Sequence, residues 1–198
     1  LSDGLIFSSN YLEKKYRYLK KPFIVVPNCI DTNIFYKNNV KKEFDYIYVG
    51  RFIPIKGNER LINFINQNKD KKFLIITSLK YFPIKNKNIR HIRKLANNKL
   101  PDFYRKSKYV LSLSLSEGSP KSLIEAIACG CIPCLSDIDS HFDILKDLGY
   151  GKIISYQKRI KPDEFLSTFN YKYYKKFINK YSMEYCVAKE INFMRKII

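Results

Sequence analysis

Short apolar runs alternate with longer amphipathic stretches along most of this chain. The runs are rich in β-branched and aromatic residues, which is typical of strands, and helix-sized segments separate most of them. Because strands that alternate with helices usually form a parallel sheet, the order predicts a sheet covered by helices on both faces. The predicted strands are Leu5–Phe7, Phe23–Val26, Tyr46–Val49, Phe73–Thr77, Ile89–Ile92, Tyr109–Leu113, Ile132–Leu135 and Lys152–Ile154.

The segments between these strands show helical spacing. Residues 58–66 place their apolar side chains on one face. Ser119 and Pro120 form a good cap and first-turn pair for a helix over Lys121–Cys129. The resulting prediction is an α/β fold, with a doubly wound, mostly parallel sheet of about six strands and a C-terminal helix. Other helical segments are predicted over Ser9–Leu19, Pro101–Lys106, Tyr171–Lys180 and Ser182–Ile198.

Length and charge limit the function classes. A chain of 198 residues fits one ordinary domain with a short appendage. It has 37 Lys and Arg against 18 Asp and Glu, a formal net charge of +19, which attracts anions such as nucleic acid, acidic lipid or phosphorylated ligands. The lysines occur in nearly every segment, and such scattered charge is more typical of a solvated surface than of a binding patch.

The five cysteines are an odd number without the spacing of a disulfide scaffold, which favours a reducing compartment. Cys129, Cys131 and Cys134 are close in sequence, but a predicted helix and strand separate them, and only His91 and His141 are available as histidine partners. We therefore expect core cysteines and no metal site. No run approaches the roughly 20 apolar residues of a membrane-spanning helix. The chain opens at leucine, which suggests a fragment.

The segment Ser116–Gly130 is the most informative for chemistry, because it follows a predicted strand and begins a predicted helix. Ligands of open parallel sheets collect at the carboxyl ends of the strands. The turn over Gly118–Pro120 leaves backbone N–H groups free at the helix start. These groups and the helix dipole favour a phosphate, so the segment predicts a phosphate-binding turn.

Two carboxylates accompany this turn, Glu117 just before the predicted helix and Glu125 within it. Eight helical residues span about 12 Å at 1.5 Å per residue. Carboxylates at this spacing can accept hydrogen bonds from hydroxyls at opposite ends of an extended sugar nucleotide. The spacing therefore fits a ribose at one end and a hexose at the other. The alternative is that both are solvent-facing glutamates, which is the usual place of Glu on helices.

This segment resembles the E-x7-E motif of the family-four, or group 1, glycosyltransferases, which have a GT-B fold and retain the anomeric configuration. Other motifs follow the family's order, so the resemblance covers nearly the whole chain. Its phosphate-binding Gly-Arg and Lys-Gly pairs are matched around Gly50 and Lys56. The matching segments are Val26–Asp31 with Phe35, Val49–Phe52, Lys56–Gly57, Ser136–Asp137 and Tyr181–Glu184.

The resemblance implies a site for a nucleotide-diphosphate sugar, used without a metal or other cofactor. It assigns catalytic roles to Glu117, which contacts donor-sugar hydroxyls, and to Arg51 and Lys56, which hold the diphosphate. Both cations are suited to the negative charge of a departing nucleoside diphosphate. Glu125 is assigned to the ribose. The remaining donor-binding residues implied are Gly50, Gly118, Ser119, Pro120, Lys121, Ser122 and Leu123.

The family's organisation implies three parts. Residues 1–22 would end a first domain and its linker, 23–180 would bind the nucleotide sugar, and 181–198 would form a helix that crosses back. The family's first domain holds the acceptor, here expected to be a glycan or a lipid-linked acceptor, so this chain alone is expected to bind a donor and transfer nothing. A cytoplasmic location is expected, with membrane-surface contact through Tyr171–Lys180 as the second choice after packing of that helix on the domain.

Two departures from the family pattern concern the nucleotide side. Cys29 stands where the linker motif usually has glycine, and Ser78–Pro83 replaces a glycine-rich loop, so the choice of nucleotide stays open. Two rival functions remain. A basic nucleic-acid-binding module would suit the charge but leaves the spacing of Glu117 and Glu125 unexplained, and no nucleic-acid partner is expected. A sugar-nucleotide epimerase or a phosphorylase-like enzyme of GT-B shape would lack this order of motifs.

Overall fold

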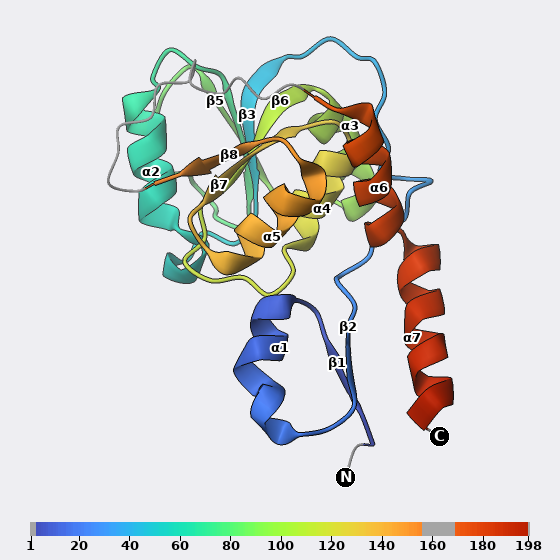
Figure 1. Cartoon of the computed structure of the whole chain (residues 1–198). Helices are drawn as coiled ribbons and strands as arrows, with labels where there is room; N and C mark the ends of the chain where they lie inside the picture. Colours follow the sequence, from blue (N-terminus) through green and yellow to red (C-terminus); the bar gives the residue numbers. More distant parts are fainter. Residues whose placement is uncertain (1–2, 156–168, 198) are drawn as a thin grey trace.

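The computed structural model describes residues 3–155 and 169–197 (Figure 1). Its main sheet has six strands, all parallel, in the order β5-β4-β3-β6-β7-β8. A separate two-stranded parallel sheet pairs β1 (Leu5–Phe7) with β2 (Phe23–Val25). This confirms the predicted α/β class and parallel sheet. The main strands are β3 (Phe44–Val49), β4 (Phe73–Thr77), β5 (Ile89–Arg93), β6 (Ser107–Ser112), β7 (Ile132–Ser136) and β8 (Lys152–Ile154).

Side chains of β3 alternate between the two faces of the sheet and so contribute to two separate cores. Tyr46 and Tyr48 pack with Leu61 and Phe64 of α2 (Asn58–Gln67) on one face. Ile47 packs on the other face, beneath the helices α3 (Leu100–Arg105) and α4 (Lys121–Ala128). Figure 1 shows α2 on one side of the sheet and the later helices on the other. The period of two therefore explains how one strand holds both helical layers.

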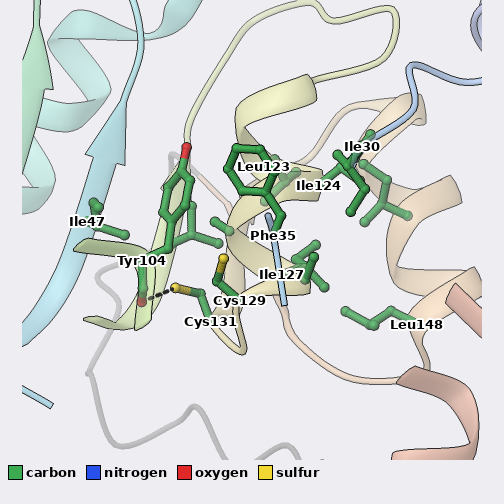
Figure 2. Close-up of a cluster of buried hydrophobic side chains, with 14 of the residues drawn as sticks. Ile30, Phe35, Ile47, Tyr104, Leu123, Ile124, Ile127, Cys129, Cys131 and Leu148 are labelled. Atoms are coloured by element: carbon green, nitrogen blue, oxygen red, sulfur yellow. Dashed lines mark hydrogen bonds between the residues drawn. The ribbon is translucent and has the colours of Figure 1, made fainter. Parts of the chain in front are cut away.

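The predicted core role of the clustered cysteines is confirmed. Cys129, Cys131 and Cys134 are free thiols with no solvent exposure. In the core that Figure 2 shows, the Cys131 thiol donates a hydrogen bond to the Tyr104 carbonyl at 3.1 Å. Burial raises the pKa of the Cys129 thiol to about 12. These thiols therefore remain protonated and pack as small apolar groups.

Two helices follow from the C-terminal pattern. α6 (Tyr171–Tyr181) buries Tyr174, Phe177 and Tyr181 against the domain, and the Tyr174 hydroxyl donates to the Ala128 carbonyl at 2.6 Å. This confirms the preferred interpretation that its apolar stripe packs inward. α7 (Met183–Ile197) continues the chain after a break at Ser182. Ile198, the last residue of the predicted helix, lies outside the described residues.

In the described part of the chain, one α-helix was not predicted. α5 (Asp139–Leu148) follows β7 after Asp137 and Ile138 and is capped by Gly149, whose φ of 73° is the left-handed conformation that favours glycine. Ile144 and Leu148 join the core on the face covered by α4. α5 is important for the site, because its first turn lies close to the carboxyl ends of β6 and β7.

The N-terminal elements lie apart from the main sheet (Figure 1). There, α1 (Asn10–Tyr16) is capped by the Ser9 side chain and followed by a 3-10 turn. Several backbone and side-chain contacts tie this part to the rest. The Asn10 amide donates to Asp143 at 3.2 Å, Lys189 of α7 donates to the Val25 carbonyl at 3.0 Å, and Ile30 forms a parallel bridge with Ser182. Segments from both ends of the sequence thus meet beside the main domain.

Candidate functional site

The direction of strand order reverses between β3 and β6, the central neighbours of the sheet. Such a switch point opens a crevice at the carboxyl ends of the strands, where ligands of open α/β sheets bind. A cavity lies here, which we call the switch-point cavity. It is lined by Tyr48, Val49, Gly50, Lys56, Val110, Leu111, Ser112, Ser114, Glu117, Ser122 and Leu123.

Lys56 and Glu117 face each other in this cavity. The Lys56 ammonium donates to Glu117 Oε1 at 2.6 Å, and the Ser114 hydroxyl donates to the same oxygen at 2.7 Å. The side chains are 26% and 10% exposed, so the pair is shielded from water but reachable from the cavity. Among the described residues, neither of these contacts uses Glu117 Oε2, which is therefore the oxygen available to a ligand hydroxyl.

Local backbone structure sets the position of Lys56. It ends a 3-10 turn over Pro54–Lys56, and Gly57 follows with a φ of 72°. A Cβ atom on Gly57 would lie 2.0 Å from the Leu113 carbonyl oxygen, so only glycine fits between this turn and the end of β6. The Leu115 N–H also donates to the Ile55 carbonyl at 2.9 Å. These contacts hold the lysine turn against the loop that carries Glu117.

The start of α4 differs from the prediction. Pro120, not Ser119, is the residue before the helix, and its side chain offers no cap. Ser119 Oγ accepts a hydrogen bond from the Asn28 N–H at 2.9 Å, and the Asn28 side-chain amide donates to the Ser119 carbonyl at 2.6 Å. The predicted N-cap role of Ser119 is therefore wrong, because the linker segment occupies the hydroxyl that would have capped the helix.

The two predicted carboxylates are not joined by a continuous helix. α4 begins at Lys121, so the residues from Glu117 to Pro120 form a loop and the helical estimate of their separation does not apply. Glu125 is 3% exposed, which excludes the solvent-facing alternative for this residue. The Tyr104 hydroxyl lies 3.5 Å from Glu125 Oε2, and Asn97 also hydrogen-bonds this carboxylate. Burial raises the pKa of Glu125 above its usual value.

The other predicted site residues are distributed around the cavity. Arg51 is exposed and follows the lining residue Gly50, and its carbonyl accepts from the Tyr48 hydroxyl at 2.8 Å. Lys121 is exposed in the first turn of α4. Gly118, Ser119 and Pro120 line a second cavity, together with residues of the N-terminal part and of α5, α6 and α7. The structure thus brings together Gly50, Lys56, Glu117, Ser122 and Leu123.

The segment that replaces the family's glycine-rich loop is anchored by an aromatic side chain. Phe82 is buried, its ring packs edge-on against Phe52 at 5.5 Å between centroids, and His91 lies 5.8 Å from it. Cys29, in the other departing motif, has no left-handed backbone; in the described part of the chain the non-glycine residues with positive φ are Lys20 and Lys94. Both departing segments therefore have ordinary local structure: Phe82 is held by aromatic packing, and Cys29 does not need the backbone conformation that favours glycine.

Sequence reasoning placed Ser136 in the matched segment Ser136–Asp137 but missed its contacts with the other polar residues behind Glu117. Ser136 Oγ donates to the Ser114 carbonyl at 2.6 Å, and His141 contacts both Ser136 and Ser112. The sequence signals were this matched segment and the serines near the ends of two predicted strands. The contribution of His141 could not be found from them, because α5, which carries the histidine, was not predicted. Within residues 3–155 and 169–197, no group of three or more His, Cys, Asp and Glu side chains could hold a metal ion. Over the same residues, no helix is apolar and long enough to cross a bilayer.

Fold and cavity together define the Rossmann-like half of a GT-B protein, with polar and charged side chains at the switch point. The family described as glycosyl transferases group 1 matches residues 30–161, and the chain belongs to this family. A capsular polysaccharide biosynthesis glycosyltransferase, CapH of Staphylococcus aureus, is 30% identical over 189 residues, covering 84% of this chain and 51% of the relative. The chain therefore spans about half the length of that relative.

Solved structures with the same fold include three that cover almost the whole chain. A sucrose-phosphate synthase from Thermosynechococcus elongatus has a TM-score of 0.80 at 16% identity, covering 100% of this chain and 59% of its own. HepE of Anabaena, solved with UDP and glucose, has a TM-score of 0.78 at 11% identity, covering 99% and 64%. TarM has a TM-score of 0.70 at 19% identity, covering 96% and 43%. At these identities the likeness establishes the fold.

Proposed function

We propose that this chain binds the nucleotide-diphosphate-sugar donor of a retaining glycosyltransferase. The observation that carries the proposal is the contact between Lys56 and Glu117 in the switch-point cavity, where a cation and a carboxylate from distant segments meet beside the start of α4. A sugar nucleotide offers the complementary groups, a diphosphate for the cation and hydroxyls for the carboxylate. Family membership and the structure of HepE with UDP and glucose support the same ligand class.

In this proposal the diphosphate lies between Lys56, Arg51 and the backbone turn at Gly118–Pro120. Arg51 is exposed at the end of β3 and would fold over the phosphates from the rim. Lys121 and Ser122 bring the first N–H groups of α4 to the same place, where the helix dipole favours an anion. The Leu123 N–H donates to the Pro120 carbonyl at 3.1 Å, and Leu123 contributes as a lining residue of the cavity. A bound phosphate would replace Glu117 as the hydrogen-bond acceptor for the Lys56 ammonium.

The two glutamates would hold the two sugars of the donor. Glu117 accepts hydrogen bonds from hydroxyls of the transferred sugar through Oε2. Glu125 accepts from the ribose, for which its position between Tyr104 and the exposed residue Asn97 is suitable. The nucleobase would then lie toward β4, β5 and the segment anchored by Phe82.

Transfer breaks the bond between the anomeric carbon and the β-phosphate oxygen, and the bonding electrons remain on that oxygen. The acceptor hydroxyl forms the new bond to the anomeric carbon on the same face, and its proton leaves with the phosphate or to solvent. Negative charge therefore grows on the diphosphate, where Lys56, Arg51 and the α4 N-terminus stabilise it. We propose that these residues serve as the chain's electrophilic groups without a metal.

The acceptor is proposed to be a glycan or a lipid-linked saccharide held mainly by a domain outside 23–180. The similarity to CapH, a capsular polysaccharide biosynthesis glycosyltransferase, supports this acceptor class. Residues 1–22 and 181–198 would connect to that domain, and 23–180 alone would bind donor without transfer. Free cysteines favour a reducing, cytoplasmic location. Contact of exposed Tyr171 and Tyr173 with a membrane surface is a subsidiary proposal.

Calorimetric titration of this chain with UDP-, GDP- and ADP-sugars tests the proposal. Lys56→Ala should weaken binding of the preferred donor about tenfold or more, because a phosphate loses its charge-assisted partner. Lys106→Ala is the matched control, since Lys106 also forms a lysine–glutamate pair, with Glu43 at 2.9 Å, at the opposite edge of the sheet. Failure of every sugar nucleotide to bind, or equal binding by the two variants, would overturn the proposal.

A further inference from the structure

His141 is a buried histidine that the proposed donor site does not use. It lies in the first turn of α5 with no solvent exposure, between the ends of β6 and β7. Its Nε2 lies 3.1 Å from Ser112 Oγ, and its Nδ1 lies 3.0 Å from the Ser136 carbonyl oxygen and 3.2 Å from Ser136 Oγ. The ring thus bridges one serine on each of two neighbouring strands.

These contacts fix the direction of the hydrogen bonds. A carbonyl oxygen can only accept, so the short contact to Ser136 places the imidazole proton on Nδ1. Burial lowers the pKa of His141 to about 4, which keeps the ring neutral near pH 7 and leaves Nε2 without a proton. Nε2 must therefore accept the hydrogen bond from the Ser112 hydroxyl.

This arrangement determines what Ser112 presents to a ligand. Ser112 lines the switch-point cavity together with Lys56 and Glu117. Because its proton is donated to His141, the Ser112 oxygen has only lone pairs left for the cavity and acts as an acceptor there. Glu117 Oε2 is an acceptor as well. Two acceptors in one cavity match two hydroxyl groups of a sugar, each of which can donate a hydrogen bond.

His141 also supports Glu117 through a second route. Its Nδ1 contacts Ser136, whose hydroxyl donates to the Ser114 carbonyl at 2.6 Å, and the Ser114 hydroxyl donates to Glu117 Oε1 at 2.7 Å. Both acceptors of the cavity are therefore connected to one imidazole ring. Because the tautomer of the ring is fixed, the Ser112 oxygen and Glu117 Oε2 are held at a fixed relative position. Recognition of two hydroxyls of one sugar requires such a fixed arrangement.

We propose that Ser112 is a further donor-contacting residue, an acceptor for a hydroxyl of the transferred sugar, and that His141 is the positioning residue that orients it. The inference rests on the proposed donor site and adds a specificity element to it. Ser112 would distinguish sugars by the hydroxyl it accepts from, because a sugar lacking that group leaves a half-buried acceptor unpaired.

The test compares each sugar nucleotide with its own nucleoside diphosphate, using UDP-glucose, UDP-N-acetylglucosamine, GDP-mannose and ADP-glucose beside UDP, GDP and ADP. Ser112→Ala should weaken binding of the preferred sugar nucleotide about tenfold and leave the matching diphosphate unchanged. Ser107→Ala is the matched control, since Ser107 is a buried serine at the other end of β6, bonded to the Phe103 carbonyl at 2.8 Å. It should leave both affinities unchanged.

His141 is tested by two substitutions followed by thermal unfolding of each variant. His141→Leu should reduce sugar-nucleotide affinity as Ser112→Ala does, and His141→Gln, whose amide oxygen can accept from Ser112, should restore most of it. The inference alone would be overturned if Ser112→Ala bound sugar nucleotide and diphosphate in the same ratio as the unsubstituted chain does. This holds whether both affinities are unchanged or both fall by the same factor. If the unsubstituted chain binds none of the ligands, the proposed donor site itself is wrong.

Discussion

Lys56 and Glu117 are 61 residues apart in sequence, and their side chains meet at 2.6 Å in the switch-point cavity. The pair neutralises two charges that would otherwise lie partly desolvated at the end of the sheet. It also holds the lysine turn against the loop before α4. A donor diphosphate would compete with Glu117 for the same ammonium. In the absence of ligand, the contact therefore holds the Lys56 ammonium at the place where phosphate is expected to bind.

The coupling between these two side chains is open to direct measurement. We expect Lys56→Met to destabilise the fold by about 1–3 kcal/mol, since it leaves the largely buried Glu117 carboxylate without its cation. Glu117→Gln in the same chain should remove most of that loss. Urea unfolding of the two single variants and the double variant gives the coupling energy. Additive losses would mean that the pair contributes no interaction of its own.

Gly57 should be intolerant of any side chain. We predict that Gly57→Ala destabilises the chain by more than the roughly 1 kcal/mol expected from a positive φ alone, because its Cβ would meet the Leu113 carbonyl at 2.0 Å. Gly149→Ala is the matched comparison, with a φ of 73° and a nearest contact of 3.2 Å to the Tyr173 ring. Chemical denaturation of both variants separates the clash from the backbone conformation. Equal losses would contradict the prediction.

Stability should depend on pH through His141. Its folded pKa of about 4 lies below the ordinary 6.5, so the unfolded chain binds more protons between these values. The contribution of the neutral ring is complete above about pH 6.5 and is lost as the pH falls toward 4, by about 3 kcal/mol in total. The unfolding free energy of the unsubstituted chain, measured relative to that of His141→Gln, should therefore decrease as the pH falls from 6.5 to 4. A difference that stays constant from pH 7 to pH 4 would exclude it.

Local pattern was sufficient to predict the sheet. Tyr46, Ile47 and Tyr48 alternate between two cores, and this period of two is visible in the sequence. Predicted strand boundaries match the observed ones at Leu5–Phe7, Phe73–Thr77 and Lys152–Ile154. The others differ by one or two residues at one or both ends, as where β3 begins at Phe44 instead of Tyr46. The extension follows from partners elsewhere, because Phe44 pairs with Ser107 of β6.

The site depended on contacts that local pattern does not contain. The family resemblance identified Lys56 and Glu117, but their pairing arises from two loops far apart in the chain. Serine is a residue type that often caps helices, yet the Ser119 hydroxyl accepts a hydrogen bond from the N–H of Asn28, 91 residues away. His141 was considered without a role, since its contacts to Ser112 and Ser136 require the unpredicted helix α5. Long-range polar contacts thus account for what sequence reasoning missed.

The two glutamates should have separable effects on ligand binding. If Glu125 holds the ribose, Glu125→Gln weakens binding of the nucleoside diphosphate and of the sugar nucleotide by the same factor, about tenfold. If Glu117 holds the transferred sugar, Glu117→Gln weakens binding of the sugar nucleotide alone. Calorimetry with the preferred donor and its diphosphate, applied to each variant, distinguishes these patterns.

Deoxynucleotides make the Glu125 assignment specific. A diphosphate that lacks the ribose hydroxyl contacted by Glu125 should bind the unsubstituted chain as weakly as the intact diphosphate binds Glu125→Gln, and combining the two changes should cost nothing further. Both the 2′-deoxy and the 3′-deoxy forms are needed, because either hydroxyl can donate to a carboxylate. Tyr104→Phe serves as a control for the buried surroundings, since it removes the 3.5 Å contact to Glu125 and leaves the carboxylate in place. Full additivity with both deoxynucleotides would place the ribose elsewhere.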